Sequence, residues 1–330
     1  MSVVLDVKDL VVDFKTRAGN ARVLNQVSLD LREGEILGIV GESGCGKSMT
    51  ALSIMGLIPN PPGRITSGSI SLDGQELTSM PAAKLRAIRG NRISMIFQEP
   101  MTSLNPVFRI GDQISESVLL HQNVSKKEAW KRAVEMLELV GIPEPAVRAR
   151  SYPHELSGGM RQRVMIGLAL ACKPKVLIAD EPTTALDVTV QAQIFDLLKN
   201  LQEETGTAII LITHDMGAVA ELADRVSVMY AGHVIETGST RQILDDPRHP
   251  YTRGLISCVP HLEDNPGDER PYLEEIEGVV PPLTELGTGC AFAPRCKHVM
   301  DRCLTTNPVI GRVSQQHSVA CHLLKEKELA

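Results

Sequence analysis

The 330-residue sequence predicts an α/β fold whose central sheet is parallel and covered by helices on both faces. Three observations predict it. Residues 41–48 form a glycine-rich loop directly after the apolar run 36–40. Strand-like and helix-like stretches alternate between residues 176 and 229. A helical stretch over about 111–140 lies between the glycine-rich loop and this alternation, which indicates a helical insertion into the α/β core.

Composition narrows the class of protein. Lys and Arg number 34 against 40 Asp and Glu, a formal net charge of −6, so no basic excess indicates a nucleic-acid partner. No stretch approaches the roughly 18 uninterrupted apolar residues that a membrane span needs. The first eight residues alternate like a strand and lack the basic and apolar regions of a secretory signal. We therefore expect a cytoplasmic location.

The first part of the chain is rich in strand patterns. Residues 3–14 and 22–40 alternate as strands do, and residues 65–77 resume that character after the break at Pro59–Gly63. Asp73-Gly74 is typical of a tight turn. The strand over 22–40 delivers the chain to the glycine-rich loop.

That loop reads Gly41-Glu42-Ser43-Gly44-Cys45-Gly46-Lys47-Ser48, a complete G-x-x-x-x-G-K-S motif between a strand and a predicted helix start. Backbone N–H groups and the positive end of the helix dipole favour phosphate there. Lys47 is expected to reach the β- and γ-phosphates, and the Ser48 hydroxyl to bind Mg²⁺. The motif predicts a nucleoside triphosphate site.

A second anion-binding feature opens a helix predicted from Ser157 to Ala171. Ser157 suits the N-cap position, but Gly158 and Gly159 in the first turn cost about 1 kcal/mol each relative to alanine. Bare N–H groups at a helix start bind anions. The chain thus has two phosphate-binding features, which suggests that they serve different nucleotides.

The alternation then resumes with the apolar strand 176–179, which ends in Asp180-Glu181. In phosphate-loop ATPases the first carboxylate of such a pair helps to hold Mg²⁺, and the second polarises the attacking water. A helix over 188–203, a strand over 208–213, a helix over 215–224 and a strand over 226–229 follow.

Together these segments resemble the nucleotide-binding domain of ABC transporters over about residues 3–235. The matching motifs, in chain order, are Walker A at 41–48, a glutamine loop at Gln98, the LSGGMRQR signature at 156–163, Walker B at 176–181, a D-loop at 185–187 and a switch histidine at His214. The resemblance implies a RecA-like phosphate-loop core with an antiparallel β part and a helical subdomain at about 99–170. It also implies head-to-tail dimers that place each ATP between Walker A of one subunit and the signature of the other.

The resemblance further implies a role for each matching residue. Glu181 is the general base, His214 contacts the γ-phosphate, and Gln98 senses Mg²⁺ and water. Phe14 stands where this family places an adenine-stacking aromatic residue. Alternatively, Phe14 is a core residue of the strand. Mg²⁺ would be held by Ser48, Gln98 and Asp180. The implied nucleotide-binding set is Phe14, Gly41, Ser43, Gly44, Cys45, Gly46, Lys47, Ser48, Met49, Gln98, Ser157, Gly158, Gly159, Asp180 and Asp187.

Two further segments, 98–106 and 248–252, resemble the oligopeptide/dipeptide permease branch of this family. That branch includes relatives that handle nickel, glutathione or antimicrobial peptides. The implied function is an ATPase that energises peptide import from the cytoplasmic face of the inner membrane. Its implied partners are a second ATPase subunit (a paralogue or an identical copy), two transmembrane permease subunits and an extracytoplasmic peptide-binding protein. A soluble ABC ATPase acting on nucleic acid or ribosomes and a scaffold without turnover are the rival classes.

We expect the ATPase domain to occupy residues 1–245 and a C-terminal extension to occupy 246–330. The segment 259–289 has five prolines and eight carboxylates against a single arginine, which predicts an extended linker.

Four cysteines follow this linker, Cys290, Cys296, Cys303 and Cys321. Such thiolates suit Zn²⁺ or an iron–sulfur cluster, but the spacing matches neither common pattern, and His298, His317 or His322 could replace a zinc ligand. Unrelated buried thiols and a disulfide pair are the other interpretations. The segment 289–296 resembles the extension of peptide-importer ATPases, which implies a 4Fe–4S cluster, with zinc as the second choice.

One cysteine lies inside the phosphate-binding loop. Cys45 stands beside the Lys47 charge and a helix N-terminus, two features that lower the pKa of a thiol. A reactive thiol whose alkylation would inhibit the protein is one interpretation; the favoured one is an arbitrary small residue at a variable position.

Overall fold

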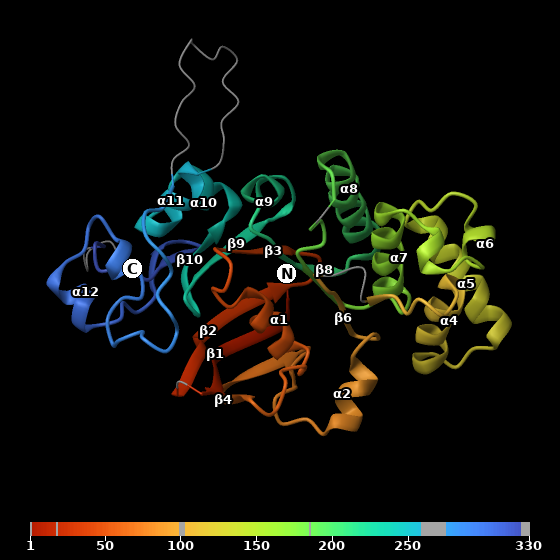
Figure 1. The fold of residues 1–330 in the computed structure, drawn as a ribbon, viewed down its shortest axis with the longest axis horizontal. Coiled ribbons are helices and arrows are strands. Elements are labelled where there is room, and N and C mark those ends of the chain that lie inside the picture. Colours follow the sequence, from red (N-terminus) through yellow and green to blue (C-terminus); the bar gives the residue numbers. More distant parts are fainter. Residues whose placement is uncertain (1, 18, 99–102, 185, 259–274, 325–330) are drawn as a thin grey trace, which may run out of the picture.

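The computed structural model describes residues 2–17, 19–98, 103–184, 186–258 and 275–324. Its strands form two sheets, a smaller antiparallel one and a larger mixed one, with a helical group at one end of the molecule and the C-terminal extension at the other (Figure 1). Among the described residues no helix combines the length and the apolar character needed to cross a membrane.

The smaller sheet has the strand order β2-β1-β4-β5 and is antiparallel throughout. Its two long strands pair along most of their length, with bulges that bend them. The predicted strand 22–40 is in fact two strands, because a turn at residues 33–34 ends one before the other begins. The bounds are β1 (Val3–Thr16), β2 (Gly19–Arg32), β4 (Gly63–Leu72) and β5 (Gln75–Glu76).

The larger sheet has the order β11-β12-β10-β9-β3-β8-β7-β6. The five strands from β9 to β6 are parallel, as the sequence predicts, and they are almost entirely buried apolar residues. They are β3 (Ile36–Val40), β6 (Ile93–Ile96), β7 (Val176–Asp180), β8 (Ala208–Ile212) and β9 (Arg225–Tyr230).

Three antiparallel strands extend one edge of this sheet, and the sequence analysis did not predict them. They are β10 (His233–Ser239), β11 (Gly311–Ser314) and β12 (His317–Val319). The chain end therefore returns to cover β10. His317 of β12 lies 2.8 Å from the carboxylate of Glu236 on β10, and both side chains are buried.

The helical group is formed by α4 (Ile110–His121), α5 (Lys126–Leu139), α6 (Pro145–Arg148) and α7 (Gly158–Leu170). The single helical stretch predicted at 111–140 is two helices. Ser125 ends the intervening turn and caps α5 by accepting a hydrogen bond from the Glu128 backbone N–H.

The other helices connect strands or belong to the chain end. They are α1 (Lys47–Ile54), α2 (Ala82–Ile88), α8 (Val188–Thr205), α9 (Met216–Leu222), α10 (Thr240–Asp245), α11 (Pro250–Ser257) and α12 (Asp301–Thr305), with short 3₁₀ turns at Pro153–Glu155 and Ala293–Arg295.

Two hydrophobic clusters hold these layers together. One joins the antiparallel sheet, α1 and one face of the large sheet. The other runs from the opposite face of that sheet into the helical group. Side chains of the described part of the predicted linker, including Ile276, Val280, Leu283 and Leu286, also pack against this second cluster. The phosphate-binding loop emerges where β3 leaves the space between the two clusters.

Candidate functional site

The loop 41–48 lies between β3 and α1, as the motif predicts. Lys47 is the first residue of α1 and is buried; its ammonium donates to the carbonyl oxygens of Gly41 at 2.7 Å and Glu42 at 3.1 Å. Ser43 and Gly44 form the exposed crest of the loop, and Met49 is half-buried in the first turn of α1. The lysine charge is therefore held inside the loop that would receive a phosphate.

Two glycines of the loop cannot be replaced without distortion. A Cβ on Gly41 would lie 2.2 Å from the Met229 carbonyl oxygen, and one on Gly46 would lie 2.8 Å from the Leu24 side chain. Both also adopt positive φ, +150° and +108°. The close fit of the loop against β9 and β2 thus requires glycine, and it leaves the other side of the loop open at Gly44.

The carboxylate at the end of β7 meets the start of α1. The Ser48 hydroxyl donates to Asp180 at 3.1 Å, and Asp180 is 3% exposed. Burial raises the pKa of Asp180 to about 6, and the neighbouring Glu181 acts in the same direction. A pocket of about 770 Å³ has all three predicted Mg²⁺-binding residues, Ser48, Gln98 and Asp180, in its wall. A hydroxyl, an amide oxygen and a carboxylate are oxygen donors, so this set fits Mg²⁺.

Side chains from three segments converge on Glu181. The Gln98 amide donates to one carboxylate oxygen at 2.9 Å, and the Thr184 hydroxyl donates to the same oxygen at 3.0 Å. His214 Nδ1 lies 3.3 Å from the other oxygen. The carboxylate is mostly covered, whereas the His214 side chain is 69% exposed. The fold therefore brings together the three residues predicted as catalytic, Gln98, Glu181 and His214.

Thr184 was missed by the sequence analysis. It follows Glu181 by three residues, and its backbone N–H also closes a turn onto the Glu181 carbonyl. The Pro182-Thr183-Thr184 segment after the paired carboxylates was the available signal, because a turn at that point directs a hydroxyl back onto the carboxylate.

The signature segment caps α7 in the predicted way. The Ser157 hydroxyl accepts a hydrogen bond from the Met160 backbone N–H at 3.3 Å, which confirms Ser157 as the N-cap. Ser157 and Gly158 are exposed, and Gly159 is half-buried against Val190 of α8. The free N–H groups at this helix start are thus accessible to a ligand from outside the chain.

Phe14 and Asp187 occupy the ends of two elements. Phe14 lies near the end of β1, is half-buried, and packs against the hydrophobic cluster beneath the antiparallel sheet. Asp187 caps α8 by accepting a hydrogen bond from the Val190 N–H at 3.0 Å. Adenine stacking by Phe14 and nucleotide contact by Asp187 both stay predictions. Ala185 of the predicted D-loop lies outside the described residues.

The suggestion that the surroundings of Cys45 lower its thiol pKa is wrong. The thiol is 1% exposed, because it lies beneath the loop beside Gly41. Burial raises the pKa of Cys45, and the opposing effect of the Lys47 charge does not overcome it. The sequence analysis considered only the charge and the helix N-terminus. Desolvation of the thiolate outweighs the opposing effect of the Lys47 charge on the pKa, so the buried thiol is protonated at neutral pH.

The predicted cluster site is not supported. Burial raises the pKa of Cys290, Cys296 and Cys321, and the cysteines are near enough to influence one another electrostatically. Yet among the described residues no group of three or more His, Cys, Asp or Glu is arranged to hold a metal ion. Two of the proposed substitute ligands have other partners, since His317 pairs with Glu236 and His322 Nε2 lies 2.8 Å from the Thr306 carbonyl oxygen.

Comparison with known families gives two matches. Residues 24–184 match the ABC transporter family, and residues 235–303 match the C-terminal region of oligopeptide/dipeptide transporters. Among solved structures, the dimeric ATP-binding cassette MJ0796 bound to ADP and Pi is similar with a TM-score of 0.64 and 30% identity. The match covers 72% of this chain and 99% of that one.

Curated relatives are similar over almost the whole chain. The oligopeptide transport ATP-binding protein OppD of Bacillus subtilis is 52% identical over 97% of this chain and 88% of its own length. The dipeptide transport ATP-binding protein DppD of the same organism is 49% identical over 99% and 96%, respectively. A putative peptide import ATP-binding protein of Brucella melitensis is 49% identical over 96% of both chains.

Proposed function

Because the chain belongs to the ABC transporter family of ATP-binding proteins, we propose that it hydrolyses ATP to energise the import of di- and oligopeptides across the cytoplasmic membrane. The similarity of residues 235–303 to the oligopeptide/dipeptide transporter C-terminal region supports peptides over nickel, glutathione or antimicrobial peptides, as do the names of the relatives. We divide the chain into the ATPase domain 1–245 and the extension 246–330.

The single observation that carries the ATPase proposal is the convergence of Gln98, Thr184 and His214 on Glu181, beside the phosphate-binding loop and Asp180. A carboxylate held by hydrogen bonds in a fixed position is suited to orient a water molecule and take its proton. We assign Glu181 as the general base. Gln98 and His214 orient it, and they are placed to respond to the γ-phosphate.

The phosphate side of the site has its own assignments. Lys47 would leave its two loop carbonyls to pair with the β- and γ-phosphates, and the loop N–H groups would bind the same oxygens. Ser48, Gln98 and Asp180 would hold Mg²⁺. Once bound, Mg²⁺ neutralises charge that develops on the phosphate oxygens. Phe14 would stack on the adenine ring.

We propose that the signature segment contacts the nucleotide that a second chain binds. Ser157, Gly158, Gly159 and Asp187 would face the ATP held by the phosphate-binding loop of a partner ATPase subunit, either a paralogue or a second copy. The exposure of Ser157 and Gly158 supports this assignment. The further proposed partners are two transmembrane permease subunits and an external peptide-binding protein, with the ATPase peripheral on the cytoplasmic side of the membrane.

A 4Fe–4S cluster or Zn²⁺ at Cys290, Cys296, Cys303 and Cys321 rests on the sequence resemblance and on the proximity of the four thiols. The described geometry does not fit a metal site, so no step of the mechanism depends on one. Metal analysis of anaerobically purified protein tests this assignment. Stoichiometric iron with absorbance near 400 nm supports the cluster, stoichiometric zinc supports the alternative, and metal-free protein rejects both.

The test of function is ATPase stimulation. Phosphate release by the chain is measured alone, with its permease subunits and peptide-loaded binding protein in vesicles, and with DNA or RNA. We expect stimulation by the peptide-loaded membrane complex only. Stimulation by nucleic acid would favour the soluble ATPase class, and absence of turnover under every condition would favour a scaffold. Lys47→Ala is the control that shows turnover to be intrinsic to this chain.

A further inference from the structure

The C-terminal extension touches the phosphate-binding loop through one ion pair. Arg295 donates two hydrogen bonds to the carboxylate of Glu42, at 2.6 Å and 3.0 Å, in a two-pronged arrangement. The Arg295 side chain is 4% exposed and that of Glu42 is 28% exposed. Paired, sheltered Arg–carboxylate contacts of this kind fix geometry as well as charge.

Further contacts hold the Arg295 side chain in a fixed orientation. Its guanidinium also donates to the carbonyl oxygens of Ile276 and Glu277, at 2.8 Å and 3.0 Å. It lies over the rings of Tyr230 and Phe292, with its central carbon about 6 Å from each ring centre. These contacts leave Arg295 little freedom, so the position of Glu42 is defined from the extension's side.

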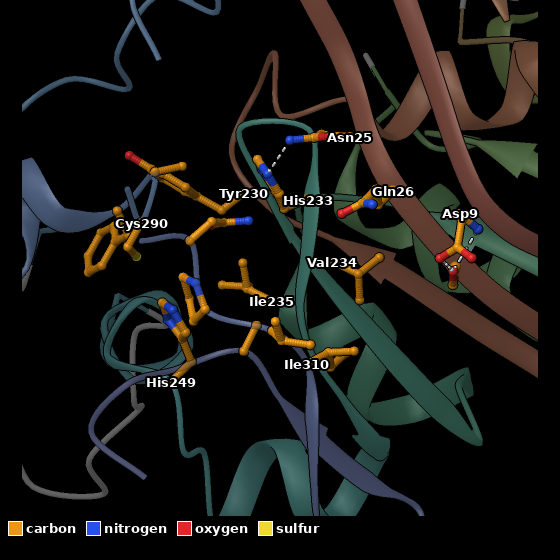
Figure 2. Close-up of a pocket in the computed structure, with 17 residues that line it drawn as sticks. Asp9, Asn25, Gln26, Tyr230, His233, Val234, Ile235, His249, Cys290 and Ile310 are labelled. Carbon is orange, nitrogen blue, oxygen red and sulfur yellow. Dashed lines mark hydrogen bonds between the residues drawn. The ribbon is translucent and has the colours of Figure 1, made fainter. Parts of the chain in front are cut away.

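The aromatic side chains beneath Arg295 connect the extension to β9 and α11. The Tyr230, Tyr251 and Phe292 rings pack against one another at 4.7–5.5 Å between centres. Figure 2 shows Tyr230, His249 and Cys290 together at one end of a cavity of about 460 Å³, with Asp9 at the other end. Tyr230 and Tyr251 are fully buried, so the base on which Arg295 rests is rigid.

Glu42 is held at three points. Its backbone N–H donates to the Tyr251 hydroxyl at 2.8 Å, its carbonyl oxygen accepts from Lys47, and its carboxylate accepts from Arg295. Tyr251 and Arg295 both come from the last quarter of the chain. The second residue of the phosphate-binding loop is thus anchored by segments outside the sheet that carries the loop.

We propose that Arg295 is a positioning residue of the nucleotide site, which acts through Glu42 to fix the phosphate-binding loop and to neutralise a carboxylate beside the bound phosphates. This inference rests on the proposed function, since it requires the loop 41–48 to bind ATP. An unpaired Glu42 carboxylate would repel the polyphosphate, so neutralisation by Arg295 lowers the free energy of the bound state.

Charge gives the proposal a signature that a purely structural ion pair lacks. Arg295→Ala removes both hydrogen bonds, whereas Glu42→Gln leaves at most one, between the glutamine oxygen and the guanidinium; the two variants leave opposite charges beside the loop. Arg295→Ala leaves a free carboxylate, which repels ATP. Glu42→Gln leaves a free guanidinium, which attracts it. A purely structural pair predicts no recovery when Glu42→Gln is added to Arg295→Ala, because the contact is already lost. The proposal predicts a larger loss from Arg295→Ala than from Glu42→Gln and a partial recovery in the double variant.

The experiment measures the Kd of the full-length chain for a fluorescent ATP analogue, with the unfolding midpoint recorded for every variant. We expect Arg295→Ala to raise Kd about tenfold and Glu42→Gln to raise it by no more than about twofold. Adding Glu42→Gln to Arg295→Ala should recover part of the loss, because the repelling carboxylate is then removed. Arg295→Lys keeps the charge without the two-pronged contact and should lie between Arg295→Ala and wild type.

The matched control is Lys297→Ala. Lys297 lies two residues from Arg295 and pairs with Glu277 at 3.2 Å, but both side chains are about three-quarters exposed. We expect this variant to bind the analogue as wild type does. Equal losses from Arg295→Ala and Glu42→Gln, or a wild-type Kd for Arg295→Ala, would overturn the inference. If Lys47→Ala also bound normally, the proposed function itself would be rejected, so the two failures are distinguishable.

Discussion

We propose Glu181 as the residue on which hydrolysis depends in this site. Its carboxylate accepts hydrogen bonds from Gln98 and Thr184 and lies beside His214, so replacing it with glutamine keeps the size but removes the base. We expect Glu181→Gln to retain ATP binding, to lower phosphate release at least about 100-fold, and to accumulate as a closed dimer. Phosphate release and size-exclusion chromatography with ATP check this. Hydrolysis near the wild-type rate would rule out Glu181 as the general base.

Asp180 gives the site a pH dependence. Burial raises its pKa to about 6, so the native state favours the protonated form and this group's contribution to folding stability falls as pH rises from about 4 to 6. Metal binding needs the ionised form, so protons compete with Mg²⁺ below pH 6. We expect KM for MgATP to rise about fourfold between pH 7.5 and 5.5 from this competition alone. Steady-state kinetics at fixed MgATP concentration measures it, and an unchanged KM contradicts it.

The sequence analysis identified residues whose proposed role can be inferred from the neighbouring sequence. Lys47, Asp180 and His214 each follow a strand, and the strand ends bring them to one side of the sheet. It failed where the environment comes from distant segments. Burial beneath the loop made Cys45 unreactive, and the pairing of Arg295 with Glu42 joins positions 253 residues apart. Burial and long-range pairing are properties of the folded chain that spacing along the sequence does not record.

At the scale of elements, one substitution at the start of α7 should raise folding stability and lower ATPase activity. Among the described residues, a Cβ on Gly158 would meet only Leu186, at 4.0 Å, so alanine fits there and removes the cost of glycine in a helix. We expect Gly158→Ala to raise the free energy of unfolding by up to about 1 kcal/mol. The added methyl group would also narrow the anion site, so we expect ATPase activity to fall. Urea unfolding and phosphate release are compared on the same preparation.

Opposite changes in the two measurements would identify the exposed helix start as a ligand surface. If the variant were more stable and fully active, Gly158 would have no role in binding, and the signature assignment would rest on Ser157 and Gly159 alone.

Elements were predicted well where they carried a strong local pattern. The helix from Ser157 and the strands β7 and β8 are examples, because they combine a clear cap or an unbroken apolar run. The sequence analysis missed α2, β6, β10–β12 and the short helices α6 and α10–α12. The strand β6 is four residues long, and β11 has exposed and half-buried residues only. Their strand conformation is determined by pairing with a neighbouring strand, which a window along the sequence does not include.

At the scale of the whole molecule, the exposed signature predicts that one chain does not form a complete site. If each pocket combines the loop 41–48 of one chain with Ser157 of another, Lys47→Ala and Ser157→Arg are each inactive as pure proteins. A mixture contains dimers with one intact pocket. Random pairing of two self-associating variants gives at most about a quarter of wild-type activity.

Phosphate release from the mixture, compared with each variant alone, is the measurement. Recovery that declines on dilution supports shared pockets. Absence of recovery, together with full wild-type turnover at nanomolar concentration, would indicate that a solitary chain holds the whole site.

The pairing of Glu42 with Arg295 has a consequence for biosynthesis. A ribosome adds Arg295 only 253 residues after Glu42. If translation stops between α11 and Arg295, the product has the loop and the strands up to β10 but lacks the guanidinium that neutralises Glu42. On our proposal this truncated product binds ATP poorly, so it competes weakly with complete subunits for assembly into the transporter.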